Sequence, residues 1–505
     1  RYEKALAWSL SHSGAVLAAA ALVLAGSGLL YWQLGSGFLP DMDEGAFVLD
    51  YRMPPGTSLE ETDRVLKHVE EILRATPEVE SYSRRTGARL ALAIAEPHTG
   101  DFLVRLKRDR DRALEEITSG LRSKILASEP AIEVEFPHIL EDLVGDLAWS
   151  PQPIEIKLYG DDAAAYRQAA ARVAEWLPSV RGVVDVINQT IPIGPSLNFR
   201  IDPEKAARAG FRVADVAALE SAILDGTLAT QMIRGDRLLG IRVRYPQQYR
   251  RTAGGLQSLL ITSPTGQTVP LSSIASMETE SATYEIRREN LRTLAAVTAR
   301  LEGRDLGSAM AEIRRRLPEE VKLAPGMEVD YGGLYQLQKE SFFGLTVVLL
   351  ASILLIFIIL VAEFQSFSHP LAILAATLLC TSGSLLALFV SGQTLNISSF
   401  MGIIMVVGIV HKNGILMLDS EKEFSRRGFG LNDAIYHAGR RRLRPILMTA
   451  LATVFGMLPL ALGIGSGAKM LQPLAIAVIG GVLVSMILSL LVTPVLYGAL
   501  RRRGA

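Results

Sequence analysis

Residues 397–419 read ISSFMGIIMVVGIVHKNGILMLD, and this stretch decides the fold class of the chain. It is predominantly apolar, and as a helix rising about 1.5 Å per residue it can cross the roughly 30 Å hydrocarbon core of a bilayer. The stretch nevertheless contains Lys412, about eight residues or roughly 12 Å from its carboxy-terminal end. We therefore predict a membrane protein with an ionisable side chain inside one of its spans.

Six segments of this kind occur along the chain and predict six transmembrane helices. They cover approximately residues 13–34, 341–362, 370–391, 396–419, 445–463 and 471–499. The first run is too long for a signal-peptide core and no clear cleavage site follows it, so it is interpreted as a span. A large charged region separates the first segment from the other five. Because the chain begins with Arg1 and not with Met, we expect a fragment, a trimmed chain or a natural split half.

Basic residues predict the orientation of the spans. They cluster at the N-terminus, after the fourth span and at the C-terminus, as Arg1, Lys4, Arg426, Arg427, Arg440, Arg441, Arg442, Arg444, Arg501, Arg502 and Arg503. Placing these clusters in the cytoplasm satisfies the positive-inside rule for every short loop. The large region then lies outside, which in a bacterial inner membrane is the periplasm.

Composition excludes several classes of function. Half of the 505 residues are apolar (49%), 21% are charged, and 52 basic residues balance 52 acidic ones, so no net charge favours nucleic acid. The single cysteine, Cys380, is expected to be a small apolar filler in a helix. No Cys/His cluster has metal-ligand spacing, and no nucleophile–base pair or nucleotide-binding loop occurs. We expect neither an enzyme nor a bound cofactor.

The large region reads as repeated strand–helix–strand units, which pack as split βαβ sandwiches. The first has a strand over Ala46–Met53, a helix with an apolar stripe of Leu59, Leu66, Val69, Ile72 and Leu73, and a strand near 79–83. The second has a strand over Ile154–Tyr159, a helix over Ala163–Leu177 and a strand over Val183–Ile187. The third has a strand over Leu294–Leu301, a helix over Leu306–Leu317 and a strand over Met327–Tyr331. Residues 200–277 break the rhythm, with two short helices, a strand over Leu239–Tyr245 and a turn at Pro264–Gly266, and predict an inserted subdomain.

Lys412 has no obvious partner in this sequence. An ammonium in hydrocarbon costs several kcal/mol unless it is paired, hydrated or neutral. The alternative is that it snorkels to the surface, but a lysine side chain covers only about half of the distance. Glu363 and Asp419 lie at the ends of spans, and Asp419 is two turns away on the same helix. We expect the partner acid to come from outside this sequence.

Four further polar residues accompany Lys412 on the fourth and fifth spans. The fifth span begins RRRLRPILMT, with Pro445 interpreted as a first-turn proline. If the helix starts before Pro445, Arg442 and Thr449 share one helix face, because they are seven residues apart. Thr449 could instead bond the preceding turn's carbonyl, and Arg442 could be a positive-inside anchor. His411 points about 100° away from Lys412 and is expected to be a packed or tuning residue. Asn413 could hydrogen-bond across helices.

Several stretches together resemble signatures of the resistance–nodulation–division (RND) efflux transporters, in the carboxy-terminal half of the pump. They are FLPDMDEG (38–45), PGTSLEET (55–62), VPLSSIA (269–275), GIVHKNG (408–414) and RLRPILMT (442–449). The resemblance covers the whole chain. It implies a membrane α-helical plus α+β fold: six transmembrane helices (1+5), a periplasmic domain of ferredoxin-like porter subdomains, and an inserted docking subdomain. The implied parts are an N-terminus and first helix (1–37), a first porter subdomain (38–137), a second in two pieces (138–199 and 281–335), a docking-like insertion (200–280) and a five-helix bundle with a basic C-terminus (336–505).

The resemblance also implies a mechanism. Lys412, Arg442 and Thr449 match the family's proton-relay positions, with Asn413 and His411 as supporting residues, and the partner acids lie in the amino-terminal repeat. Protonation of such an acid would free Lys412 and shift the helices, coupling export to inward proton flow. The implied partners are two further protomers in a homotrimer, a periplasmic adaptor protein and an outer-membrane channel.

The substrate class is open at this stage. The Lys-Asn-Gly run resembles hydrophobe, amphiphile or multidrug exporters, since heavy-metal members usually carry an acid there. A heavy-metal exporter is the alternative, for which Met53, Met232 and Met277 could supply soft ligands, although scattered methionines mostly pack. A protein- or lipid-export accessory built on the same repeat is disfavoured by the docking-like insertion. A membrane-anchored binding module would leave Lys412 without a purpose.

Overall fold

The computed structural model describes residues 2–40, 42–88, 96–140, 143, 152–190, 196–250, 252–280, 285–465 and 467–503. It has two compact units: Arg1–Met53 with Leu59–Thr190 and Ile286–Ala505, and Pro54–Ser58 with Ile191–Glu285. Arg1, residues 281–284 at the predicted start of the second piece of the second porter subdomain, and the side chains of Arg502 and Arg503 lie outside the described residues.

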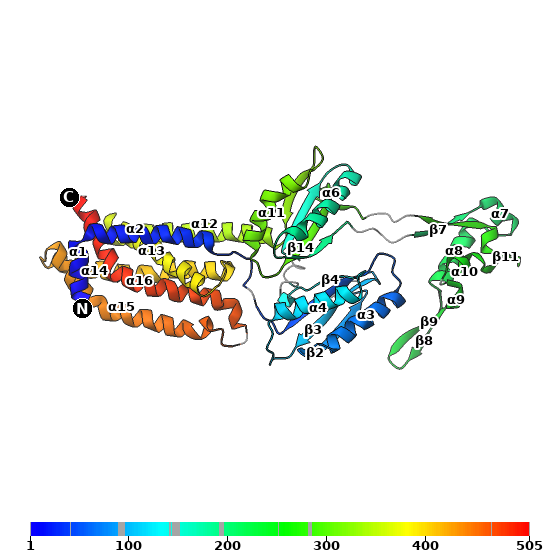
Figure 1. The fold of residues 1–505 in the computed structure, drawn as a ribbon, viewed down its shortest axis with the longest axis horizontal. Coiled ribbons are helices and arrows are strands. Elements are labelled where there is room, and N and C mark those ends of the chain that lie inside the picture. The colour runs from blue at the N-terminus through cyan, green and yellow to red at the C-terminus, as the bar shows by residue number, and fades with distance from the viewer. Residues whose placement is uncertain are drawn as a thin grey trace. The chain divides into compact units, whose positions relative to one another are not determined.

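Six helices in the described part of the first unit are long and apolar enough to cross a membrane, which confirms that prediction. They are α2 (Ser13–Gln33), α12 (Leu334–Phe364), α13 (Ser368–Val390), α14 (Ile397–Arg426), α15 (Leu431–Ala461) and α16 (Ala468–Arg503). Figure 1 shows them side by side, with the short helix α1 (Tyr2–Ser11) at their end. The spans of α13, α14 and α16 are mostly covered by other helices, whereas α2, α12 and α15 are mostly exposed.

Small residues bring the central helices into close contact. A Cβ atom added to Gly402 of α14 would lie 2.7 Å from the carbonyl oxygen of Leu474 in α16. A Cβ on Gly383 of α13 would overlap the carbonyl oxygen of Gly480 in α16, and the reverse also holds. Such contacts require glycine and are typical of helix packing in membranes.

The interpretation of Pro445 as a first-turn residue is wrong. α15 begins at Leu431, so Pro445 lies in the helix interior. The helix extends because Ala434, Ile435 and Ala438 are buried against the bundle, and this packing outweighs the hydrogen bond that proline cannot donate. α15 therefore begins about 14 residues before the predicted apolar stretch, at its basic end. These residues add about 21 Å to the helix.

The first subdomain is a four-stranded sheet, in the order β2-β3-β1-β4, with every neighbouring pair antiparallel. Its elements are β1 (Ala46–Arg52), α3 (Leu59–Arg74), β2 (Val79–Thr86), β3 (Thr99–Leu106), α4 (Leu114–Ser128) and β4 (Glu133–Glu135). Leu66, Val69 and Leu73 of α3 are buried in its core as the apolar stripe predicts. Leu59, assigned to the same stripe, is 56% exposed because it is the first residue of the helix.

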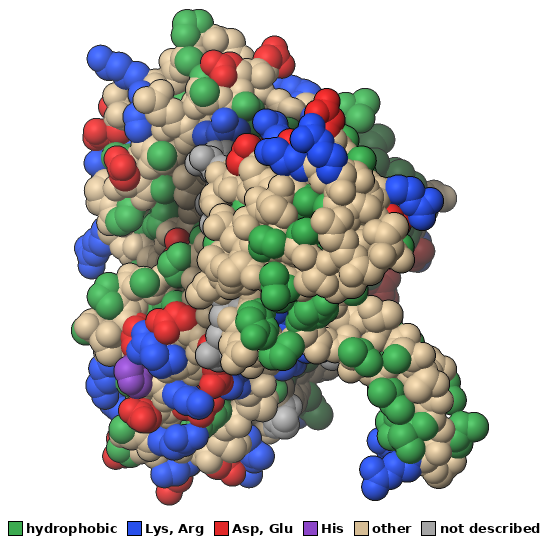
Figure 2. All heavy atoms as spheres, turned by 90° about the vertical axis from the view of Figure 1, so that its right-hand side faces the viewer, with side chains coloured by type: hydrophobic (Ala, Val, Ile, Leu, Met, Phe, Trp, Pro, Cys, Tyr) green, Lys and Arg blue, Asp and Glu red, His purple; other side chains and the backbone are tan. Residues whose placement is uncertain are grey.

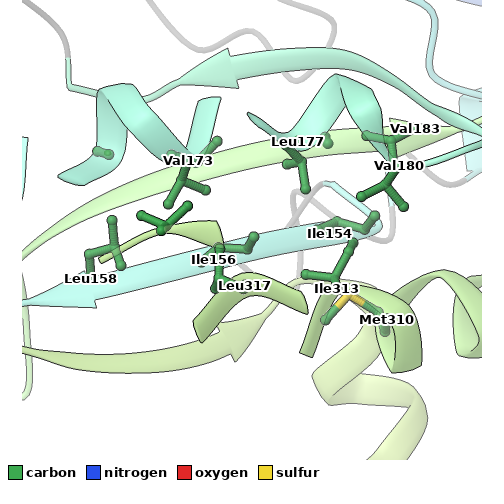
Figure 3. Packing of buried hydrophobic residues seen from close by; sticks show 14 of the residues in the cluster. Ile154, Ile156, Leu158, Val173, Leu177, Val180, Val183, Met310, Ile313 and Leu317 are labelled. Carbon is green, nitrogen blue, oxygen red and sulfur yellow. The ribbon is translucent and has the colours of Figure 1, made fainter. Parts of the chain in front are cut away.

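The second subdomain joins sequence segments that lie more than 100 residues apart. Strands β13 (Arg287–Glu289), β14 (Arg292–Leu301), β5 (Ile154–Tyr159) and β15 (Glu328–Gly332) follow one another in the sheet, and β6 (Val183–Asn188) also pairs with β14. Helices α6 (Ala163–Trp176) and α11 (Leu306–Glu320) supply its other core residues, with the short turn η1 (Leu177–Ser179). Figure 3 shows Ile154, Ile156 and Leu158 of β5 among side chains from α6 and α11.

The second unit has its own apolar core, around Phe211, Ile223 and Ile261. Its elements are β7 (Ser196–Ile201), α7 (Pro203–Arg208), α8 (Val213–Leu224), β8 (Thr227–Arg234), β9 (Arg237–Val243), α9 (Gln247–Arg250), α10 (Ala253–Gln257), β10 (Leu260–Thr262), β11 (Thr268–Pro270), η2 (Leu271–Ser273) and β12 (Ala275–Glu280). The predicted turn at 264–266 joins β10 to β11. The strand predicted over Leu239–Tyr245 is β9, which begins and ends two residues earlier because it pairs with β8 in a tight hairpin. Every residue of β8 and β9 is exposed, including Ile233 (76%), and hydrophobic side chains cover the hairpin surface in Figure 2.

Candidate functional site

Lys412 lies on a narrow exposed stripe of α14. The exposed residues Met401, Met405, Gly408, Lys412 and Asp419 recur at intervals of four, three, four and seven residues, so they share one helix face. The remaining faces are largely covered by α12, α13, α15 and α16. The bundle therefore leaves uncovered the side of its central helix that carries Lys412.

No described residue pairs with Lys412. The structure gives its ammonium no ion pair and no hydrogen bond within the described ranges. Asp419 and Glu363 are exposed and form no ion pair with it. The apolar middles of the six spans carry no other acid. A lone ammonium on an uncovered face of a span is costly in lipid, so this face needs a covering element that brings an acid.

Two polar contacts join α14 to α15: Arg441 pairs with Glu423 at 2.8 Å near the exposed end, and Arg442 bonds Ser420 one turn deeper. Arg442 Nε donates a hydrogen bond to the hydroxyl oxygen of Ser420, at 2.6 Å. The two helices are joined by the short loop 427–430 and pack together, so they run antiparallel. Eight residues back from Ser420 is Lys412, and eight residues forward from Arg442 is Ala450. Lys412 and Thr449 therefore lie at similar depth in the span.

Thr449 is exposed, and its hydroxyl hydrogen-bonds the carbonyl oxygens of Pro445 and Ile446, both at 3.1 Å. This is the local bonding that a threonine in a helix commonly adopts. It leaves lone pairs of the hydroxyl available to a group that covers this face. The structure thus brings Thr449 to the depth of Lys412 without a direct bond between them.

The two supporting residues lie on the buried side of α14. His411 is 3% exposed, with Nδ1 against the Val407 carbonyl oxygen and Nε2 at 3.5 Å from the Thr377 hydroxyl of α13. Asn413 is 5% exposed. His411 therefore occupies the packed position that its helical phase predicts, away from the Lys412 stripe.

A cavity of about 870 Å³ lies between the two subdomains of the first unit and the segment that follows α2. Its wall includes apolar side chains such as Phe38, Leu39, Leu140 and Leu334. Its charged lining is strongly acidic, with one arginine, Arg304, against the five acids Glu44, Glu115, Glu116, Glu302 and Asp305. An apolar wall with an acidic rim suits a cation that carries hydrophobic groups.

Sequence reasoning missed this cavity. Its lining comes from positions 37–40, 42, 44, 115, 116, 119, 138, 140, 153, 301–306, 334 and 394, which meet only in the folded chain. One signal was available: Glu115 and Glu116 are adjacent acids in the first turn of α4. Acids are favourable at any helix N-terminus, so that signal alone does not distinguish a site from a cap.

A buried charge network joins the two subdomains beside this cavity. Arg122 of α4 contacts Asp185 of β6 at 2.7 Å and Glu302 at 2.5 Å. Burial raises the pKa of Asp185, and the Arg122 guanidinium opposes that effect. Arg300 and Glu135, also buried, pair at 3.3 Å across the same interface. Buried ion pairs therefore hold the two subdomains together beside the cavity.

The described residues contain no group of three or more His, Cys, Asp or Glu side chains placed to hold a metal ion. The three methionines considered as soft ligands do not form a site either. Met53 is buried in the core of the first subdomain and Met277 packs against the core of the second unit. Met232 is 48% exposed on β8. Met53 and Met277 therefore have the environments of packing residues, whereas Met232 lies on the surface of the hairpin.

Comparison with known proteins places this architecture. A profile of the AcrB/AcrD/AcrF family matches residues 1–501. The chain is 31% identical, over its whole length, to 48% of the cobalt-zinc-cadmium resistance protein CzcA of Cupriavidus metallidurans. It is 28% identical, over 98% of its length, to 48% of the multidrug resistance protein MdtC of Yersinia pestis. A crystal structure of a heavy metal efflux pump superimposes with a TM-score of 0.86 at 29% identity, covering all of this chain and 52% of that one. The chain thus spans about half the length of the relatives it matches.

Proposed function

The chain belongs to the AcrB/AcrD/AcrF family of RND permeases, and we propose that it is the carboxy-terminal half of a proton-driven efflux pump. One observation carries the proposal: the uncovered stripe of α14 presents Lys412, without a partner in the described residues, at mid-span. The proposed pump lies in the bacterial inner membrane. Its two sheet subdomains and the second unit lie in the periplasm, opposite the basic ends of α14, α15 and α16.

In the proposed mechanism the other half of the pump covers this stripe with a helix that carries an acid. Lys412 pairs with the carboxylate, and protonation of that carboxylate weakens the pair and frees the ammonium. Thr449, at the same depth, accepts or donates a hydrogen bond as the partner changes protonation state. Arg442 positions Thr449 through its bond to Ser420. Each proton entering across 100 mV supplies about 2.3 kcal/mol for the change in packing.

The proposed cargo is an organic cation with hydrophobic groups. The cavity lining supports this choice, since five acids and one arginine accompany an apolar wall. The similarity to MdtC agrees with it. A metal cation is the second candidate, supported by the similarity to CzcA and to the heavy metal efflux pump. The acidic rim suits a metal ion that keeps its water, whereas the apolar wall favours the organic cation.

The proposed assembly is a homotrimer of complete pumps with a periplasmic adaptor and an outer-membrane channel. The exposed apolar hairpin of β8 and β9 supports assembly, because isolated exposed hairpins with apolar faces are unstable alone and mark contact surfaces. The second unit would provide the contact.

Replacing Lys412 tests the proposal. Cells expressing the complete pump with Lys412→Ala should lose resistance to its cargo, while membrane levels and melting temperature stay unchanged because Lys412 forms no ion pair or hydrogen bond within the described residues. Lys339→Ala is the matched control, since Lys339 is an exposed lysine on α12 before its apolar segment. Resistance that survives Lys412→Ala would sink the relay assignment.

The cargo is tested separately. Glu115→Gln together with Glu116→Gln should lower resistance to organic cations such as quaternary ammonium compounds and leave resistance to uncharged compounds unchanged. Growth in cobalt, zinc and cadmium salts is measured in parallel. If the pump gave resistance to the metals and not to the organic cations, a metal cation would replace the organic cation as the proposed cargo.

A further inference from the structure

The basic end of the helix bundle holds a second cavity, of about 400 Å³. It lies where three elements meet: the turn from α12 to α13, the last turns of α14 and the last turns of α16. The turn is sharp because Gln365 adopts a left-handed φ of 48° and ends α12. On α14 the cavity lies about two and a half helical turns beyond Lys412, toward the carboxy-terminal end of the helix. The proposed function does not use this cavity.

One wall of the cavity is formed by Glu421, whose negative charge is neutralised by Arg501. Glu421 has a side chain only 1% exposed. Its carboxylate accepts hydrogen bonds from the Ser425 hydroxyl at 2.8 Å and from the Arg501 guanidinium at 3.1 Å. Arg501 therefore cancels the charge of Glu421, and neither contributes a net charge to the cavity.

Two further basic side chains line the same cavity without an acidic partner. Lys422 and Arg426 form no ion pair with any described residue, and the Lys422 ammonium lies 5.6 Å from the centroid of the Phe364 ring. The neighbouring Arg427 differs, because it pairs with Glu423. Lys422 is half-buried and Arg426 is exposed, so the mouth of the cavity carries a surplus of two positive charges that attracts an anion.

The cavity also offers unused hydrogen-bonding groups. The ring of His369 is stacked on Phe364, with ring centroids 4.8 Å apart, and packs against Tyr497 at 4.5 Å. Both ring nitrogens are buried and make no hydrogen bond with a described residue, and Nε2 is 3.9 Å from Glu421. The first turn of α13, with Ser368 and His369, faces the cavity. The Ser368 N–H already donates to the Ser366 hydroxyl at 3.3 Å and Pro370 has no N–H, so the donor left in this turn is the N–H of His369. A free N–H at a helix start favours a negative charge.

We propose that this cavity binds a phosphate group, held by Lys422 and Arg426 and hydrogen-bonded by His369 and the start of α13. The phosphate is that of an anionic lipid headgroup or a free phosphate ion. The position favours the lipid, because the cavity lies at the end of the spans, at the level of the headgroups, and basic pockets between transmembrane helices bind such lipids. The proposal is independent of the proposed transport function, since it concerns binding and not export.

The test uses the full 505-residue chain in nanodiscs of phosphatidylcholine with or without phosphatidylglycerol or cardiolipin. Retention of anionic lipid is measured by native mass spectrometry, and melting temperature by tryptophan fluorescence. Loss of each positive charge should weaken retention about fivefold, so Lys422→Ala with Arg426→Ala should weaken it about 25-fold. The exchange Lys422→Arg with Arg426→Lys keeps both charges and should restore binding, which distinguishes lost binding from lost folding.

Arg427→Ala is the matched control, because it removes the same charge one residue away and outside the cavity. Inorganic phosphate added to pure phosphatidylcholine nanodiscs separates the two sources. Protection by anionic lipid alone assigns a headgroup, and equal protection by inorganic phosphate assigns a free ion. Equal losses in Arg427→Ala and the double variant, or no protection by either probe, would overturn the proposal.

Discussion

Arg442 of α15 donates a hydrogen bond to Ser420 of α14 at 2.6 Å, and Ser420 is completely buried between the helices. The bond holds the fifth span in the register that brings Thr449 to the depth of Lys412. Arg442 therefore acts on the proposed relay through position as well as charge.

Arg442→Ala should destabilise the bundle by about 1.5–3 kcal/mol, the usual range for a hydrogen bond from a charged group, and reduce export. Ser420→Ala should give a smaller loss, and the double variant should be no worse than Arg442→Ala alone, because both remove the same bond. Melting temperature in detergent and resistance of cells are the measurements. Arg444→Ala, two residues along the same helix and exposed, is the control and should leave both unchanged. Additive losses in the double variant would show that the bond does not set the register.

The 505-residue chain purified alone should not carry out proton-coupled transport in liposomes, because the described spans contain no acid for Lys412. Cargo flux is measured under an imposed pH gradient. The same liposomes with the complete pump provide the positive control. Flux from the chain alone would refute the requirement for a partner acid.

Arg122→Ala should destabilise the interface between the two subdomains by about 3–5 kcal/mol, because it leaves the buried carboxylate of Asp185 without its cation. Arg64→Ala removes an arginine from an exposed pair with Glu61 on α3, and should cost about 0–1 kcal/mol. Thermal unfolding of the full chain in detergent compares the two. Equal shifts would mean that the Arg122 network is no stronger than a surface pair.

The raised pKa of Asp185 gives a pH dependence of known sign. The folded state binds a proton at this carboxyl more readily than the unfolded state, so between the two pKa values stability from this group rises as pH falls. The difference in melting temperature between wild type and Asp185→Asn should therefore shift in favour of wild type from pH 7 toward pH 4. A shift in the opposite direction would mean that the Arg122 pair outweighs burial.

Local sequence patterns predicted the elements of the sheets well. β5 spans Ile154–Tyr159 as expected, and α6 and α11 begin at the predicted residues, because apolar spacing and a proline or capping residue mark their ends. Such local patterns could not predict that β14 and β15 pair with β5. This pairing joins strands more than 100 residues apart, and strand pairing depends on the whole core, not on the spacing within each strand.

The candidate site could likewise be predicted only in part. The sequence predicted which residues are polar and how deep they lie in the spans, because an ionisable residue within an apolar run is rare and usually functional. The start of α15 could not be predicted in this way, because helix propensity and burial of Ala434 and Ile435 extend the helix through Pro445. The exposure of Lys412 required the packing of four neighbouring helices, and the acidic cavity required segments from both subdomains.

The close fit of α16 also constrains how the protein is made. α16 contacts α1, α2, α13, α14 and α15, and its Gly480 meets Gly383 backbone to backbone. It is also the last of these helices to leave the ribosome. Until residues 468–503 are synthesised, the small-residue faces of α13 and α14 have no complementary surface, so these six helices complete their packing only after α16 has been made. Premature termination before α16 should therefore yield inserted but unassembled helices, which are substrates for membrane proteases and not partly active pumps.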